Sequence, residues 1–281
     1  MAGVSTKDIK NRIRSMESTK QITKAMEMVA ASKLRQAQNR VTASRPYFEI
    51  LHSTILDIVA NNRDFSSPYL QKRGGDRVLF IVIAGDRGLA GGYNSNILKL
   101  CMQQMEGKDA TVLPIGKKAV DFFRSKNVKL LTDTYAEAAE VSIGDCFSIS
   151  KTLARAYLEG EYDEIVIGYT TFVSVLSQTP TALRLLPLKK EDTAASSRMD
   201  TIFEPNAEEA FAAIVPEYLG GVLYGALCEA QASEQAARRT AMDSATSNAE
   251  DMIADLSLKY NRARQAAITN EIIDIVSGAN A

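Results

Sequence analysis

Cysteine and histidine are scarce in this chain. Its three cysteines, Cys101, Cys146 and Cys228, lie far apart without a CxxC spacing, and it has one histidine among 281 residues. A disulfide scaffold needs more cysteines, and a zinc site needs closely spaced Cys or His ligands, so the sequence argues against both. The pattern fits a reducing compartment.

Long apolar segments are also lacking. No apolar run approaches the ~20 residues that span a bilayer, and the N-terminus lacks the h-region of a secretory signal. A helical pattern begins almost at once, which leaves little room for a transit peptide. The net charge of −1 and the charged fraction of 24% are those of an ordinary soluble protein without general affinity for nucleic acid or membrane.

Glycine and proline are absent from two long stretches. Ala226–Ser277 contains neither over 52 consecutive residues, which as one α-helix would measure roughly 78 Å. Between Gly3 and Pro46 there is room for a second helix of up to about 63 Å. The helical pattern resumes past Pro46 and breaks at Asn61. The sequence therefore predicts two long helices at its two ends.

Both helices carry an apolar stripe. On the C-terminal helix the predicted seam, in steps of three and four, is Met242, Ala245, Ala249, Met252, Leu256, Tyr260, Ala263 and Ala267. On the N-terminal helix it is Ile9, Ile13, Met16, Met26, Ala30, Leu34, Ala37 and Val41, with a slip in register around Ile22 and Thr23. Spacing near 3.5 residues predicts a left-handed coiled coil. We expect Met28 and Leu34 to face outward, toward a partner that surrounds the rod.

The middle of the chain alternates between strand and helix patterns. Arg77–Ala84 is a continuous β-branched run, typical of a strand buried on both faces. Further strands are predicted at 110–115, 128–131, 163–170 and 181–188, the last as an antiparallel edge strand, and helices at 95–105, 117–126 and 147–159. This alternation predicts an α/β layer with a mostly parallel sheet.

The predicted architecture is a Rossmann-like α/β domain inserted between the two terminal helices. Its divisions are residues 1–60 for the N-terminal coiled-coil helix, 61–205 for the globular domain with its linkers, and 206–281 for the C-terminal coiled-coil helix. Lys189–Thr201 is polar and reads as a loop. Because the chain leaves the inserted domain where it entered, the two helices can pair antiparallel.

A glycine-rich turn follows the first strand. Its pattern from Gly85 to Gly92 is GxxGxxGG, and Arg87 stands where a dinucleotide fingerprint needs its second glycine. No GK[ST] follows, so it is not a P-loop. We interpret it as a structural turn that holds Tyr93 and Asn94, with Asp86 and Arg87 as a local ion pair. Nucleotide binding remains the alternative.

Catalytic signatures are lacking. His52 has no Ser or Cys motif to serve, and neither HExxH, GxSxG nor a spaced carboxylate set appears. These absences argue against a hydrolase or transferase activity of the chain itself. We expect no catalytic, cofactor-binding or metal-binding residues.

Charge is distributed unevenly along the chain. Residues 7–45 have a local excess of +7, whereas residues 225–281 have an excess of −3, so the two helices should attract. The basic helix is either a solvated face or a contact for an acidic protein surface. Nucleic acid is the poorer partner, because aromatic residues for base stacking are absent before Tyr47.

Four segments, at residues 22–35, 86–92, 232–238 and 260–271, resemble in matching order the gamma subunit family of F-type ATP synthases. The two end signatures are Ile22–Arg35 (ITKAMEMVAASKLR) and Tyr260–Glu271 (YNRARQAAITNE). Between them lie Asp86–Gly92 (DRGLAGG), which is similar to the family's central loop, and Ala232–Arg238 (ASEQAAR), which is similar to its late-helix motif. Four motifs at these spacings are far more specific than a lone glycine pattern.

The resemblance implies a central rotor shaft without catalytic chemistry. In this family the paired helices penetrate a hexamer of alpha and catalytic beta subunits, and the globular domain sits with the epsilon subunit on a membrane-embedded ring of c subunits. Ion flow through the ring turns the shaft, which cycles the beta-subunit sites for ATP synthesis, reversibly with hydrolysis. The chain would then need no cofactor, bind no nucleic acid, and lie on the cytoplasmic face of the bacterial cell membrane as a peripheral protein.

The same motifs imply contact residues. Matching positions give rotor–stator contacts at Lys24, Met26, Arg35, Arg238, Gln265, Thr269 and Glu271, and contacts with the c ring at Phe203 and Glu204. Packing in the seam or exposure on a solvated rod face is the alternative for each. The family's chloroplast form has a cysteine-bearing insertion that has no counterpart here, and Ala90 stands where the family often has Cys.

Two rival functions remain open at this point. One is a Rossmann-type nucleotide enzyme with a coiled-coil arm, and the other is a cytosolic coiled-coil tether. Binding of NAD or ATP would favour the first, and isolation without an ATPase complex would favour the second.

Overall fold

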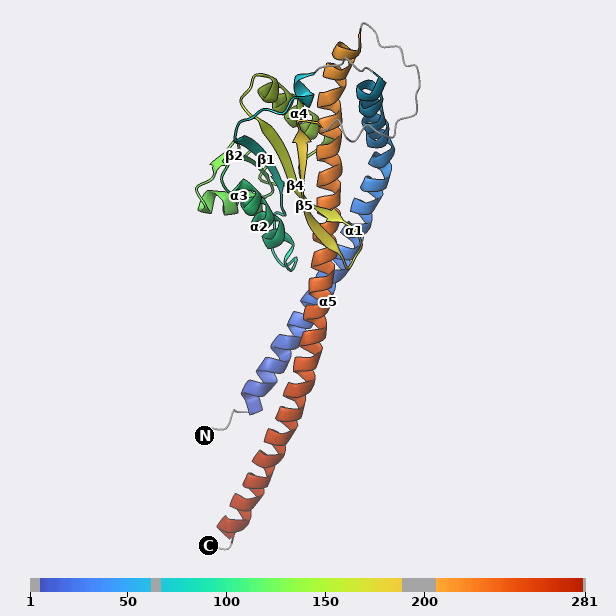
Figure 1. Cartoon of the computed structure of the whole chain (residues 1–281). Coiled ribbons are helices and arrows are strands. Elements are labelled where there is room, and N and C mark those ends of the chain that lie inside the picture. The colour runs from blue at the N-terminus through green and yellow to red at the C-terminus, as the bar shows by residue number, and fades with distance from the viewer. Residues whose placement is uncertain (1–5, 62–66, 189–205, 280–281) are drawn as a thin grey trace. The chain divides into compact units, whose positions relative to one another are not determined.

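The computed structural model describes residues 6–61, 67–188 and 206–279 (Figure 1). By its internal contacts the chain forms two compact units. Unit 1 comprises Met1–Ala31 and Arg238–Ala281, and unit 2 comprises Ser32–Ala237. Both long helices contribute to both units. The division at residues 60 and 205, which follows the secondary structure, stays a prediction.

Unit 2 contains a five-stranded sheet in the order β3-β2-β1-β4-β5. The first four are parallel, and β5 runs antiparallel to β4 at one edge. The strands are β1 (Arg77–Ile83), β2 (Asp109–Ile115), β3 (Lys129–Leu130), β4 (Glu164–Phe172) and β5 (Gln178–Leu186). The predicted fold class, with its antiparallel edge strand, is confirmed.

Helices cover both faces of this sheet. They are α2 (Tyr93–Met105), α3 (Lys117–Ser125), α4 (Ile143–Leu158) and the long α1 (Thr6–Asn61) and α5 (Ala207–Ala279), with a short 3₁₀ turn η1 (Pro68–Leu70). Alternate residues of β1 divide between two cores, because successive side chains of a strand point to opposite faces. Leu79 and Ile81 pack with α4 and α5, whereas Val78 and Phe80 pack with α2 and α3. A strand buried on both faces is what the continuous apolar run predicts.

The N-terminal helix is longer than its breaker residues suggest. α1 continues through Pro46, a residue that removes one helical N–H and was expected to interrupt the pattern. Because Pro46 is exposed, this break in the ladder faces solvent and costs less than it would in the core.

Close packing explains one glycine of α5. A Cβ on Gly220 would lie 2.4 Å from Cδ1 of Phe147, so the approach of α5 to α4 requires glycine there. An 18-residue window of α5 has a mean hydropathy of 1.4, and half of it is buried. Length and composition alone are weak evidence for a membrane span, since a buried core helix passes the same test. In the described part of the chain, α5 is the one helix that passes it.

The predicted elements agree with the observed ones to within a few residues. The largest shift is at α4, which begins at Ile143 and not at 147, because Ser142 and Asp145 form a capping box. The predicted loop Lys189–Thr201 lies outside the described residues.

Candidate functional site

The paired helices of unit 1 are the candidate functional surface, because most of the predicted contact residues lie on them. Two interactions fix their pairing. The hydroxyls of Thr23 and Thr246 lie 2.8 Å apart, and Lys20 Nζ lies 2.7 Å from Glu250 Oε1. As the residue number falls on α1 it rises on α5, so the helices are antiparallel, as the fold prediction requires.

The α1 seam does not slip. In unit 1 a set of buried or half-buried positions follows steps of four and three without a break: Ile9, Ile13, Met16, Lys20, Thr23, Glu27 and Ala30; the predicted seam residue Met26, beside Glu27, is half-buried as well. The predicted slip around Ile22 and Thr23 is wrong, because Lys20, Thr23 and Glu27 occupy three successive seam positions. A search for apolar residues misses these positions, although the geometric repeat is intact.

The α5 seam differs from its prediction at three positions, one of which is Ala267, an exposed residue. Met242 and Ala249 are buried as expected, but Thr246 replaces Ala245 as the buried residue between them. Met252 is 51% exposed, and its neighbour Ile253 is half-buried at the seam. Thr246 is tolerated there because its hydroxyl also lies 2.8 Å from the carbonyl of Met242.

In unit 2 the α1 stripe continues into a small core. Leu34 and Ala37 pack with Ala232 and Ala236 of α5, flanked by Phe172 and Val175 of the β4–β5 hairpin. Leu34 is therefore buried, and the expectation that it faces outward is wrong. Met28 is 66% exposed, as expected.

The predicted contacts on α1 have different surroundings. Lys24 is exposed, and its Nζ donates to Glu27 Oε2 at 2.7 Å. That hydrogen bond, with the Glu27 charge, raises the pKa of Lys24. Met26 is half-buried, and Arg35, in unit 2, is exposed.

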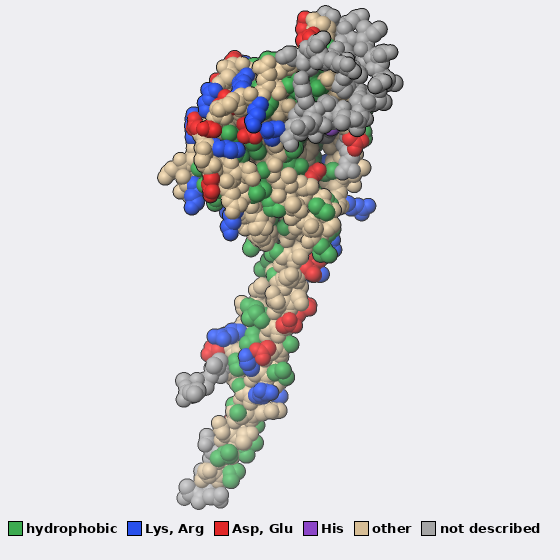
Figure 2. All heavy atoms as spheres, in the orientation of Figure 1, with side chains coloured by type: hydrophobic (Ala, Val, Ile, Leu, Met, Phe, Trp, Pro, Cys, Tyr) green, Lys and Arg blue, Asp and Glu red, His purple; other side chains and the backbone are tan. Residues whose placement is uncertain are grey.

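The predicted contacts on α5 are strung along one helix. Arg238 is half-buried, whereas Gln265, Thr269 and Glu271 are exposed, and the Thr269 hydroxyl donates to the Gln265 carbonyl at 2.9 Å. Around them the last turns of α5 expose Ile268, Ile272, Ile273, Ile275 and Val276, a surface that appears green in Figure 2. Phe203 and Glu204 lie outside the described residues. The structure does not gather the predicted contacts into one pocket; it spaces them along a rod.

The glycine-rich turn is held by side chains of the chain itself. The Gly85 N–H donates to Asn94 Oδ1 at 2.8 Å, and Asn94 Nδ2 donates to the Arg87 carbonyl at 3.1 Å. Tyr93 is buried beneath the turn. This arrangement matches the structural turn inferred from the sequence.

Asp86 does not form the expected ion pair with Arg87. Its carboxylate accepts hydrogen bonds from the backbone N–H groups of Ala138 at 2.8 Å, Ala139 at 3.2 Å and Lys117 at 3.3 Å. Backbone N–H groups at the carboxyl ends of parallel strands are where doubly wound folds hold a ligand phosphate. Here a carboxylate of the chain occupies that position, which argues against the nucleotide-enzyme alternative. No local pattern in the sequence indicates these long-range bonds.

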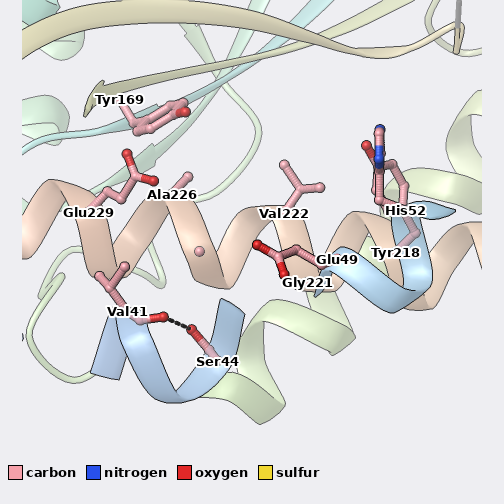
Figure 3. A pocket seen from close by; sticks show the side chains of 11 residues that line it. Val41, Ser44, Glu49, His52, Tyr169, Tyr218, Gly221, Val222, Ala226 and Glu229 are labelled. Carbon is pink, nitrogen blue, oxygen red and sulfur yellow. Dashed lines mark hydrogen bonds between the residues drawn. The ribbon is translucent and has the colours of Figure 1, made fainter. Parts of the chain in front are cut away.

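A cavity of about 290 Å³ lies between α1, α5 and β4 (Figure 3). His52 faces the Tyr218 ring, with centroids 5.8 Å apart, and the Ser44 hydroxyl donates to the Val41 carbonyl at 3.2 Å. A nucleophilic serine would instead have to bond the histidine. Among the described residues no group of three or more His, Cys, Asp or Glu side chains could hold a metal ion.

Comparison with known proteins agrees with the resemblance to the gamma subunit family. The family model described as ATP synthase matches residues 5–281. The ATP synthase gamma chain of Ruminococcus albus is 46% identical over 279 residues, covering 97% of each chain. That of Lachnoclostridium phytofermentans is 43% identical over 290 residues, covering 99% of each.

Solved structures share the fold. A chain of the Euglena gracilis mitochondrial ATP synthase rotor in rotational state 1 has a TM-score of 0.66 at 19% identity, covering 94% of this chain and 98% of that one. A chain of the central stalk and c ring of the Tetrahymena thermophila enzyme has a TM-score of 0.59 at 22% identity, covering 80% and 99%. With a family model that spans nearly the whole chain and bacterial relatives above 40% identity, the chain belongs to the ATP synthase gamma chain family.

Proposed function

We propose that this chain is the central rotor shaft of a bacterial ATP synthase. It couples ion flow through a c-subunit ring to the conformational cycle of the catalytic beta subunits, and it runs in reverse when ATP is hydrolysed. The observation that carries the proposal is the antiparallel pairing of its two chain ends in unit 1, joined by the Thr23–Thr246 and Lys20–Glu250 contacts. A rotor shaft needs a stiff rod of this kind, and paired helices supply one.

The chemistry of the surface supports a rod that turns inside other subunits. Positive and negative side chains alternate on the paired helices (Figure 2). Exposed ion pairs of this kind are weak and exchange readily, so they suit a contact that must be made and broken with each turn. We assign the rotor–stator contacts to Lys24, Met26 and Arg35 on α1, and to Arg238, Gln265, Thr269 and Glu271 on α5.

The end of α5 supports a second kind of contact. The pairing of Lys20 with Glu250 places the start of the described α1, Thr6, opposite about residue 264 of the antiparallel α5. Beyond that point α5 exposes several isoleucines, and a contiguous exposed apolar patch marks a contact site for another protein. A sleeve of alpha and beta subunits would cover these residues and hold the C-terminal end of α5.

The remaining assignments complete the proposal. The chain has no catalytic site, and catalysis belongs to the beta subunits. Unit 2 would bear the epsilon subunit and rest on the c ring, with Phe203 and Glu204 in that contact. The chain would associate with the cytoplasmic face of the cell membrane only through the complex.

The test is purification of the complex through a tag on this chain. We expect alpha, beta and epsilon subunits and the c ring in an assembly that hydrolyses ATP, with the paired helices inside the alpha–beta hexamer in several rotary positions. Isolation of the chain without these subunits would refute the proposal. Within the assembly, Arg238→Ala and Gln265→Leu should lower ATP-driven ion pumping more than they lower thermal stability. Unchanged pumping would overturn those two assignments.

A further inference from the structure

The ammonium group of Lys24 already pairs with a carboxylate of the same chain. Lys24 Nζ lies 2.7 Å from Glu27 Oε2, one helical turn away on α1. The Lys24 side chain is 55% exposed, but that of Glu27 is only 13% exposed. Glu27 is also one of the polar residues at a seam position of the coiled coil. Its partly buried carboxylate needs a cationic partner, since an unpaired charge there would be costly.

The helices are pinned at this level, so Glu27 cannot easily turn outward. Thr23, four residues before Glu27 on the same stripe, is 9% exposed and bonds Thr246, which is 7% exposed. The Lys20–Glu250 pair joins the two helices one step further along. Two neighbouring seam positions, Lys20 and Thr23, therefore hold this stretch of α1 against α5.

Lys24 also faces acidic groups of the other helix. Asp243 and Glu250 of α5 act with Glu27 to raise its pKa. The cluster thus contains three carboxylates and two ammonium groups, those of Lys20 and Lys24. An acidic loop of a surrounding subunit that approaches Lys24 meets a surface that is not net positive, and its carboxylate must share the ammonium with Glu27.

We propose that Glu27 is a positioning residue that holds Lys24 and competes with the stator for it. The inference rests on the proposed rotor function. Glu27 limits how tightly an acidic stator loop can bind Lys24, so the contact forms and breaks as the shaft turns. Lys24 is the contact residue, and Glu27 acts through it.

The experiment uses the complete ATPase complex with Glu27→Gln, Lys24→Gln and the double variant in this chain. Glutamine keeps the shape of glutamate and an acceptor oxygen, so the coil should stay folded. The matched control is Asp255→Asn, which alters the Lys259–Asp255 pair, also 2.7 Å long and in unit 1. The readout is the maximal ATP hydrolysis rate as a function of ionic strength.

Glu27→Gln should slow hydrolysis at low salt by about 1.5- to 5-fold, the effect of strengthening one exposed ion pair. The rate should recover at high salt, because screening weakens the contact of the freed ammonium. The double variant should match Lys24→Gln alone in rate and salt dependence, since Glu27 acts through Lys24. Glu27→Asp, which keeps the charge, should stay near wild type, and Asp255→Asn should change neither rate nor salt dependence.

Two results would overturn the inference while leaving the rotor function intact. One is an assembled, active Glu27→Gln complex whose rate and salt dependence match those of wild type. The other is a double variant that is slower than Lys24→Gln alone by the same factor by which Glu27→Gln is slower than wild type, which would make Glu27 a merely structural residue. Failure of the chain to assemble into an ATPase at all would instead refute the proposed function.

Discussion

The buried threonine pair of the coiled coil gives the sharpest test of the seam. We consider Thr23→Val, Thr246→Val and the double variant, each of which replaces a hydroxyl by a methyl group of similar size. The two hydroxyls lie 2.8 Å apart, and each also lies near a carbonyl of its own helix: Lys20 at 3.1 Å for Thr23 and Met242 at 2.8 Å for Thr246. One proton per hydroxyl allows Thr23 to donate to Thr246 while Thr246 donates to Met242.

This arrangement fixes the expected magnitudes. In either single variant the remaining hydroxyl keeps its own carbonyl as acceptor, so the cost is about 0.5–1.5 kcal/mol for one lost hydrogen bond, and not the larger penalty of an unsatisfied buried group. In the double variant both polar groups leave a buried site, and the gain in apolar burial offsets much of the loss. We therefore expect the double variant to lie within about 0.5 kcal/mol of wild type, with a coupling energy of about 1 kcal/mol or more between the two positions.

Urea unfolding followed by circular dichroism at the helical band measures these differences, and amide hydrogen exchange at residues 17–30 and 243–252 assigns them to unit 1. Thr23→Ser, which keeps the hydroxyl, serves as the control and should show smaller changes than Thr23→Val in exchange at the facing helix. If the losses of the single variants simply add in the double variant, the hydroxyls are not paired. In that case the inferred antiparallel register at this level would be wrong.

Four further predictions concern unit 2. Gly116→Ala should lower the free energy of unfolding by about 3 kcal/mol or more, since φ is +96° and a Cβ would lie 2.1 Å from a carbonyl oxygen of the neighbouring strand. Gly88→Ala should change it by less than about 1 kcal/mol, because its φ is ordinary and nothing lies within 4 Å of the new Cβ. Hydrogen bonds from Arg77 lower the pKa of Asp163. The pair therefore stabilises the fold above the ordinary carboxyl pKa, and this stability is lost as the pH falls through the lowered value. The urea midpoint of Asp163→Asn should depend less on pH between about 5 and 2 than that of the wild type. All three cysteines are buried, and burial raises the pKa of Cys101 to about 12, so a thiol reagent at pH 8 should label none in the native chain and all three in denaturant.

Local patterns in the sequence were sufficient for the sheet. Arg77–Ala84 is apolar without alternation because β1 is buried on both faces, and the structure divides its residues between two cores. The edge strand β5 was predicted antiparallel, and it pairs with β4 in that direction. In these segments the local sequence pattern and the tertiary environment favour the same residues, so the local pattern is enough to predict the strand.

The seam of unit 1 was harder to predict for a physical reason. A heptad search assigns positions by apolarity, but Lys20, Thr23 and Glu27 satisfy their seam positions with hydrogen bonds and ion pairs to residues up to 230 positions away. Such partners cannot be read from one helix alone. The bonds from Asp86 to Ala138 and Ala139 were missed for the same reason.

A polar seam is a costly way to build a coil, and its position in this chain suggests what it is for. Each apolar layer contributes stability through buried area, whereas polar seam residues reduce stability and specify register. Here the three polar seam positions on α1 lie in the segment that carries Lys24. The coiled coil is therefore less stable there, but the register of its two helices is better specified. This is the level where we place a stator contact. A coil of uniformly apolar layers would be stronger there, but it would leave Lys24 without Glu27, and its ammonium would bind an acidic loop more tightly. The rod is thus least like an ideal coiled coil at the level where a turning shaft needs its contacts to be weak.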